Sequence, residues 1–145
     1  MDYMTSFDIS ASGMAVEKMR LDIMALNLAN ANSTRANGGG VYQPLKVVSA
    51  AKTASFDSEL VKQGFVDMSG AQVIDIRPVE TEPRLVFDPN HPDANEKGYV
   101  SYPNINPVSE MVTLIEATRA YEANVKAMNA AKSMALRALE IGSTR

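Results

Sequence analysis

The residues best suited to bind a metal ion lie in one short stretch, DPNHPDANE, which spans residues 88–96 and contains the only histidine of the chain, His91. The hard oxygen donors that Ca²⁺ prefers are carried there by Asp88, Asn90, Asp93 and Glu96. However, the spacing and the central glycine of an EF-hand are missing, and two prolines stiffen the stretch. Its composition is also that of a turn. We therefore predict a surface turn at this position and no metal site.

The other polar residues do not form the patterns of a catalytic or cofactor-binding site. Gly38–Gly40 is not followed by the Lys-Ser/Thr pair and helix start of a phosphate-binding loop, so it indicates a flexible connector. Glu80 and Glu82 could act as acid and base, but no nucleophile accompanies them in the sequence. Basic residues near the C-terminus alternate with glutamates, which is not the pattern of a nucleic-acid face. The sequence predicts that the protein is not an enzyme, and that it has no cofactor and no nucleic-acid partner.

Composition sets wider limits. The 145 residues suit one domain with a modest core, and the formal net charge of −3 gives no general attraction to nucleic acid or anionic membranes. The absence of cysteine excludes disulfides, thiolate metal sites and a cysteine nucleophile. No apolar run is long enough for a transmembrane helix, so no membrane insertion is expected. The N-terminal residues lack the pattern of a cleaved signal peptide.

The N-terminal segment predicts a helix that starts near Thr5 or Ser6, where Thr5 and Asp8 resemble a capping box. Apolar residues form two stripes on different faces of this helix: Phe7, Met14, Leu21 and Leu28 on one face, and Val16, Met19, Ile23 and Leu26 on the other. Residues 19–28 are therefore apolar nearly all round, which is typical of a helix buried on more than one side. Because one partner helix cannot cover all of this surface, the pattern favours self-assembly over a simple helical hairpin.

Asparagines crowd into the end of this helix, in the stretch LNLANANSTRANGGG at residues 26–40. Asparagine disfavours helix interiors because its amide competes for backbone hydrogen bonds. Asn27 and Asn30 lie one turn apart and could bond a neighbouring backbone or end their own helix. We hypothesise that they fix the register between packed helices, as a buried asparagine does in coiled coils, and that a hinge follows them.

Residues 41–102 have β character. Strands are expected at residues 41–48, 73–79, 84–88 and 98–102 because β-branched and alternating residues gather there. Residues 55–64 are ambiguous and fit a loop with a short helical turn.

The C-terminal segment predicts a helix of some 35 residues. Asn106 is a suitable N-cap with Pro107 at the first helical position, and Gly142 is expected to stop the helix after Ile141. Heptad a and d spacing is followed by Met111, Leu114, Thr118, Tyr121, Val125, Met128, Ala135 and Leu139, with Lys132 as the polar exception.

We therefore predict an α+β fold in which long N- and C-terminal helices pair as a coiled-coil-like domain around a small β-rich insert. The helical domain is expected to comprise residues 1–35 and 106–145, and the β-rich lobe residues 36–105. The residues expected to pack between helices are Phe7, Met14, Leu21, Ile23, Leu114, Val125, Met128 and Leu139.

Both ends of the chain resemble known signatures. FDISASGMAVEKMRLDIMALN followed by LANANSTR, at residues 7–35, resembles the N-terminal signature of the flagellar axial proteins, which include rod, hook and hook-associated proteins. Residues 110–142, EMVTLIEATRAYEANVKAMNAAKSMALRALEIG, resemble their C-terminal signature. LVFDPNHPDANEKGYVSYPNINPVSEMV, at residues 85–112, resembles the proximal-rod members of that family. Family members often have threonine and glycine after the asparagines, whereas this chain has Ser33-Thr34-Arg35.

The resemblance implies where subunits meet. Carried over residue by residue, the family motifs fall on Asn27, Leu28, Ala29, Asn30 and Asn32 near the N-terminus, and on Glu110, Met111, Glu116, Arg119, Tyr121, Asn124 and Asn129 near the C-terminus.

The resemblance also implies a function. Such a chain is a non-enzymatic structural subunit of the bacterial flagellar basal-body rod, the drive shaft that crosses the periplasm and transmits torque. It is exported by the flagellar type III apparatus without cleavage of a signal peptide, and it self-assembles through its terminal helices. Its implied partners are further copies of itself, other proximal-rod proteins, the rod–membrane-ring junction protein and distal-rod proteins.

Two other function classes stay open at this point. A free-standing helical binding module, such as an export chaperone or regulator, would be a stable monomer or dimer folded along its full length. A cell-wall hydrolase would need a catalytic carboxylate.

Overall fold

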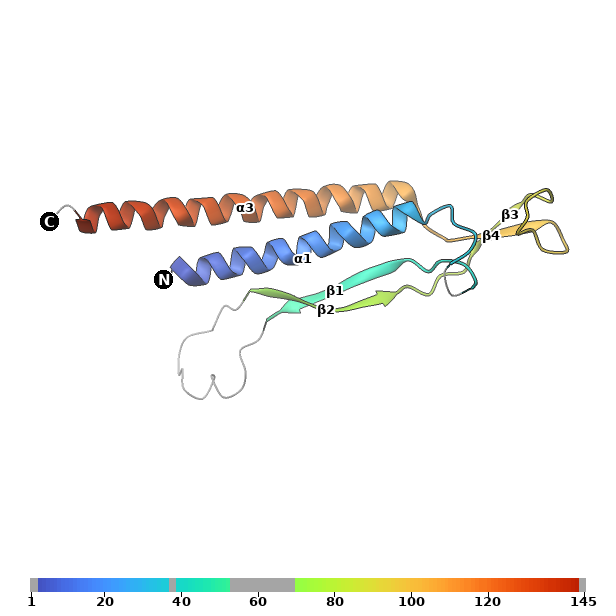
Figure 1. Ribbon diagram of the computed structural model, residues 1–145, viewed down its shortest axis with the longest axis horizontal. Helices are drawn as coiled ribbons and strands as arrows, with labels where there is room; N and C mark the ends of the chain where they lie inside the picture. Colours follow the sequence, from blue (N-terminus) through green and yellow to red (C-terminus); the bar gives the residue numbers. More distant parts are fainter. Residues whose placement is uncertain (1–2, 37–38, 53–69, 144–145) are drawn as a thin grey trace, which may run out of the picture. The chain divides into compact units, whose positions relative to one another are not determined.

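The computed structural model describes residues 3–36, 39–52 and 70–143 of the chain. The elements in chain order are α1 (Tyr3–Ala29), β1 (Leu45–Ala51), β2 (Ala71–Pro78), β3 (Arg84–Phe87), β4 (Tyr99–Tyr102) and α3 (Pro107–Ser143) (Figure 1). Two long terminal helices thus enclose, in sequence, a β-containing insert. The predicted α+β class is confirmed.

Helix α1 begins at Tyr3, ahead of the predicted start, so Thr5 and Asp8 lie inside the helix and the predicted capping box is wrong. The helix ends at Ala29 in a turn made by its own last residues. The backbone N–H of Asn30 donates to the Leu26 carbonyl at 3.1 Å, and the Asn30 side-chain amide donates to the same carbonyl at 2.9 Å. The Asn30 side chain therefore adds a second hydrogen bond to a carbonyl that the backbone already uses, at the point where the helix ends.

Helix α3 starts as predicted. The Asn106 side-chain oxygen accepts hydrogen bonds from the backbone N–H groups of Val108, at 3.0 Å, and Ser109, at 3.4 Å, which confirms the N-cap. Its predicted end is wrong, because the helix continues through Gly142 to Ser143. Gly142 does not adopt the positive φ of a glycine C-cap, so it stays in the helix as an ordinary residue.

The strands form two separate two-stranded sheets, β1 with β2 and β3 with β4. In the β3–β4 hairpin the strands are antiparallel, with Arg84 opposite Tyr102 and Phe87 opposite Tyr99. The predicted strands at 73–79, 84–88 and 98–102 are found with ends shifted by one or two residues. The strand predicted at 41–48 instead begins at Leu45, after Pro44, whose ring nitrogen cannot donate to a strand partner. Residues 55–64 lie outside the described residues.

The chain divides into two compact units. Unit 1 comprises Met1–Met19, Ser49–Ile74 and Ala117–Arg145, and unit 2 comprises Arg20–Val48 and Asp75–Glu116. Both units contain part of α1, part of α3 and strand residues. The predicted division into a helical domain and a separate β-rich lobe stays a prediction.

Small side chains form the buried contacts of unit 1. Its most buried described residues are Ser10, Val16, Ala117 and Ala131. A Cβ atom on Gly13 of α1 would lie 2.9 Å from the side-chain amide of Asn124 of α3, so the missing side chain lets the two helices approach closely. The hydroxyl of Ser12 accepts a hydrogen bond from the N–H of Ala71 at 3.0 Å, which fixes the start of β2 to α1.

In unit 2, Asn27, Val100 and Pro103 are almost fully buried. Val100 lies on the inner side of the β3–β4 hairpin, whereas Leu85 and Phe87 on the other side are 60% and 64% exposed. Phe87 packs edge-on against Tyr99, with ring centroids 5.3 Å apart.

Candidate functional site

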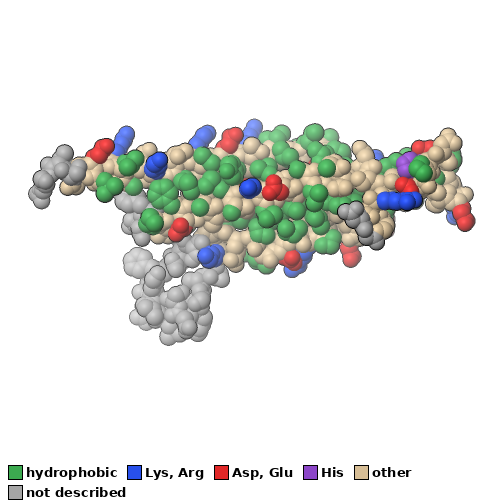
Figure 2. Space-filling view, in the orientation of Figure 1, with side chains coloured by type: hydrophobic (Ala, Val, Ile, Leu, Met, Phe, Trp, Pro, Cys, Tyr) green, Lys and Arg blue, Asp and Glu red, His purple; other side chains and the backbone are tan. Residues whose placement is uncertain are grey.

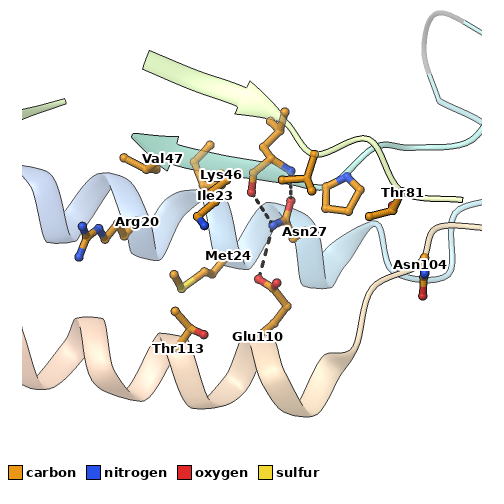
Figure 3. A pocket seen from close by; sticks show the side chains of 13 residues that line it. Arg20, Ile23, Met24, Asn27, Lys46, Val47, Thr81, Asn104, Glu110 and Thr113 are labelled. Carbon is orange, nitrogen blue, oxygen red and sulfur yellow. Dashed lines mark hydrogen bonds between the residues drawn. The ribbon is translucent and has the colours of Figure 1, made fainter. Parts of the chain in front are cut away.

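In unit 2, Asn27 near the end of α1 is the centre of a cluster of hydrogen bonds. Its side-chain oxygen accepts hydrogen bonds from the Leu45 backbone N–H and the Tyr42 hydroxyl, both at 2.9 Å. Its amide donates to the Leu45 carbonyl at 2.9 Å and to Oε2 of Glu110, in the first turn of α3, at 3.4 Å (Figure 3). Asn27 is only 2% exposed, and one side chain thus joins α1, β1 and α3.

The sequence accounts for part of this arrangement. Asn27 lies on the α1 face that turns toward β1, one helical turn before Ala31, which is also buried. Asn106 caps α3 and so fixes the first turn that carries Glu110. Burial first, and then the nearby Glu110 carboxylate, raise the pKa of the Tyr42 hydroxyl above its ordinary value, so the neutral phenol that donates to Asn27 is favoured.

A groove of about 470 Å³ opens beside Asn27. It lies within unit 2, between α1, β1 and the first turns of α3, and Figure 3 shows Met24 and Thr113 pointing toward one another across it. Its apolar lining comes from Ile23, Met24, Pro44, Leu45, Val47 and Val79. Two basic side chains, Arg20 and Lys46, and one carboxylate, Glu110, supply its charges.

The other residues of the N-terminal motif lie in varied positions. The Asn30 amide donates to the Leu26 carbonyl, as described, and its oxygen accepts a hydrogen bond from the Ser33 hydroxyl at 3.3 Å. Asn32 and Ala29 are exposed, and Leu28 is half-buried. Asn27 lies against Glu110 of the C-terminal motif. The hydrogen bonds of the Asn27 side chain described above all go to residues of the same chain. The register that Asn27 holds is therefore the one between α1, β1 and α3 of its own subunit.

The C-terminal motif residues are spread around α3. Met111 is 53% exposed, and Glu116, Arg119 and Asn129 are exposed as well. Tyr121 is half-buried, and Asn124 is the residue that faces Gly13. The motif therefore contributes both to contacts inside the subunit and to its surface.

The predicted packing residues are half-buried with one exception. The half-buried ones are Phe7, Met14, Leu21, Ile23, Leu114, Val125 and Met128. Leu139 is 70% exposed and has no such burial within the chain.

Large apolar side chains also lie on the outside of α3 (Figure 2). In unit 2, Val108 is 69% exposed, Met111 53%, and Val112 and Ile115 51% each; we call these four residues the outer ridge. In unit 1, more than half of each of Met134, Leu136, Leu139 and Ile141 is exposed. The most buried residues of α1 and α3 are thus mostly small, whereas many large apolar side chains of α3 are exposed.

The stretch considered for metal binding is a turn, as predicted. Asp88 accepts a hydrogen bond from the Asn90 N–H at 3.2 Å, and Asn95 accepts one from the Tyr99 N–H at 2.9 Å. His91 Nδ1 accepts from the Asp93 N–H at 3.1 Å. These side chains fold the loop on itself, and within the described ranges no group of three His, Asp or Glu residues is arranged to hold a metal ion.

Asp93 ties this turn to the segment after α1. The Thr34 hydroxyl donates to its carboxylate at 2.7 Å, and the Arg35 guanidinium forms an ion pair with it. The hydrogen bond from Thr34, helped by the charge of Arg35, lowers the pKa of the Asp93 carboxyl below its ordinary value. Two residues of Ser33-Thr34-Arg35, the stretch that departs from the family pattern, thus contact Asp93 within the chain.

Several residues of the site were not expected from the sequence. Tyr42 and Leu45 follow a glycine-rich loop, and no local pattern marks them as partners of Asn27. No sequence pattern singled out Arg20 and Lys46, which line the groove. Asp93 was considered for metal binding, and its actual partners, Thr34 and Arg35, lie some 60 residues away in sequence.

None of the helices that the structure describes combines the length and hydropathy needed to cross a lipid bilayer.

Comparison with known proteins places these features in a family. The family model for the C-terminal region of flagellar basal body rod FlgEFG proteins matches residues 96–141. The flagellar basal-body rod protein FlgC of Bacillus subtilis is 45% identical over 148 aligned residues, covering 94% of this chain and 96% of that protein. FlgC of Aquifex aeolicus is 37% identical, covering 97% of both chains, and FlgC of Borreliella burgdorferi is 33% identical, covering 97% and 98%. The chain therefore belongs to the FlgC family of flagellar basal-body rod proteins.

Proposed function

We propose that this protein is a non-enzymatic structural subunit of the proximal rod of the bacterial flagellum, which assembles through its terminal helices and transmits torque. The observation that carries the proposal is the outward placement of large apolar side chains on α3, together with family membership over nearly the full length. Burial of such side chains against neighbours is favourable by about 25 cal/mol per Å² of apolar surface.

Torque transmission requires stiffness between packed subunits. Helix α3 has 37 residues and α1 has 27, so at about 1.5 Å per residue each offers a long line of contact to its neighbours. Close-packed protein interiors have low compressibility, and an array of such helices would resist twisting in the same way.

The proposed partners are further copies of the chain, other proximal-rod proteins, the rod–membrane-ring junction protein and distal-rod proteins. The proposed location is the rod that spans the periplasm. The chain would reach it through the flagellar type III export apparatus without a cleaved signal peptide.

Electron microscopy of isolated basal bodies tests the proposal. Deletion of the gene should leave basal bodies without a complete rod, and the full-length chain supplied from a plasmid should restore it. Subunits carrying a label at Lys97, an exposed residue of the hairpin turn, should appear in the rod. Complete rods in the deletion strain would contradict the proposal.

Limited proteolysis of the purified chain separates this function from that of a free-standing binding module. A rod subunit outside the rod should be cut rapidly near both ends, because its outer apolar side chains have no neighbours. Equal protection along the whole chain, without any assembly as concentration rises, would favour the binding module.

A further inference from the structure

We propose that the groove beside Asn27 receives the outer ridge of a second copy of this chain, so that copies join head to tail. The inference rests on the proposed function and adds which two surfaces meet. Both surfaces lie in unit 2.

The outer ridge and the groove lie on opposite faces of α3. Successive residues of a helix are rotated by about 100°. Glu110 and Thr113, which line the groove, share one face with the buried Ala117. Val108, Met111, Val112 and Ile115 follow the i, i+3, i+4, i+7 pattern on the opposite face.

Because the outer ridge and the groove lie on opposite faces of α3, the contact between copies is heterologous. Because one copy carries the ridge on one side and the groove on the other, the ridge cannot enter its own groove. A ridge that binds the groove of the next copy leaves that copy's ridge open for another. Such heterologous contacts build rings when the rotation closes and helical arrays when it does not.

The groove suits a line of apolar side chains. Its volume of about 470 Å³ lies in the range found for ligand-binding pockets, and most of its lining surface is apolar. The ridge offers a row of branched and flexible apolar side chains that are at least half exposed in the single chain. Methionine at the middle of the row can adapt to an irregular wall.

Charge favours the same pairing. Between Pro107 and Glu116, α3 has two carboxylates and no basic residue, and the exposed Glu116 flanks the ridge. The groove is lined by Arg20 and Lys46 against the single carboxylate of Glu110. When the outer ridge of one copy lies in the groove of the next, Glu116 of the first copy comes near the mainly basic groove of the second. This attraction favours binding of the ridge to the groove over other pairings of the two copies.

Site-directed cross-linking tests the pairing directly, because the chain has no cysteine. One variant carries Thr81→Cys in the groove and the other carries Val112→Cys on the ridge. An equal mixture of the two full-length variants, treated with a short bismaleimide, should give a cross-linked dimer, whereas either variant alone should give little. Efficient cross-linking of Val112→Cys to itself would show that ridges pair with ridges and would overturn the inference.

A charge exchange supplies a second test. Lys46→Glu and Glu116→Lys should each weaken self-association by roughly three- to tenfold in sedimentation velocity, with a smaller effect at high salt. The double variant should regain most of the association, because every copy then carries both reversed surfaces. Lys97→Glu and Glu96→Lys, in the exposed hairpin turn, are matched controls and should have little effect.

The outcomes distinguish this inference from the proposed function. If rods form but Thr81→Cys is never captured by Val112→Cys, or is captured only by another rod protein, the pairing is wrong and the rod function stands. A small molecule retained in the groove, with association insensitive to the charge exchange, would also overturn the pairing. If rods are complete without the chain, the function itself fails.

Discussion

The side chain of Asn27 makes the two hydrogen bonds to Leu45 that a neighbouring strand would make. Its oxygen accepts from the Leu45 N–H and its amide donates to the Leu45 carbonyl, each at 2.9 Å. The first residue of β1 is therefore fixed to α1 through an amide that copies a peptide group. No smaller or charged side chain offers one donor and one acceptor in this arrangement.

Replacement of Asn27 by aspartate should destabilise unit 2 by about 2–4 kcal/mol, because a second oxygen then faces the Leu45 carbonyl and the Glu110 carboxylate. The amide proton of Leu45 should exchange with solvent at least roughly tenfold faster, since about 1.4 kcal/mol corresponds to a factor of ten. Adding Glu110→Gln should recover part of the loss. The exposed Asn32, replaced by alanine, is the control and should leave exchange at Leu45 unchanged.

Replacement of Asn106 by alanine should loosen the first turn of α3. The Val108 and Ser109 amides lose their shared acceptor, at a cost of about 1 kcal/mol. Hydrogen exchange at these two amides should become faster, while Asn106→Asp should keep the cap and the protection. Unchanged exchange in the alanine variant would mean that the cap does not hold this turn.

The contact of Asp93 with Thr34 should depend on pH in the acid range. Because the folded state lowers the pKa of Asp93 from its ordinary value of 3.8, this contact stabilises the fold above that value and is lost as the pH falls through the lower folded pKa. NMR shifts of Thr34 should therefore follow the titration of Asp93. In Asp93→Asn this dependence should disappear, whereas Glu96→Gln in the same turn should retain it.

Replacement of Gly13 by alanine should bring less stabilisation than helix propensity alone predicts. Alanine is favoured over glycine in helices by up to about 1 kcal/mol. However, its Cβ would lie 2.9 Å from the Asn124 amide, so this amide, which donates to the Ala120 carbonyl, would have to shift. We expect the two effects to cancel to within about 0.5 kcal/mol in thermal unfolding. Combining Gly13→Ala with Asn124→Ala should recover the gain; if Gly13→Ala alone stabilises fully, the close approach is not limiting.

The sequence by itself determined the elements that depend on local signals. The Asn106-Pro107 start of α3, the turn at residues 88–96 and the two hairpin strands follow from capping, turn composition and alternation, which act between residues close in the chain. The two family motifs pointed to flagellar axial proteins for a different reason, since they are recognisable as sequence alone.

The tertiary structure decided which residues meet. Periodicity showed that the N-terminal helix is apolar on several faces, but it did not show that Gly13 lies against Asn124, that Ala117 is buried, or that Met111 and Ile115 are exposed. In the same way, the asparagine cluster indicated a contact site, but it did not predict that Tyr42, Leu45 and Glu110 are the partners of Asn27. Such pairings depend on how close two backbones approach across the fold, and a helical period records only which residues share a face.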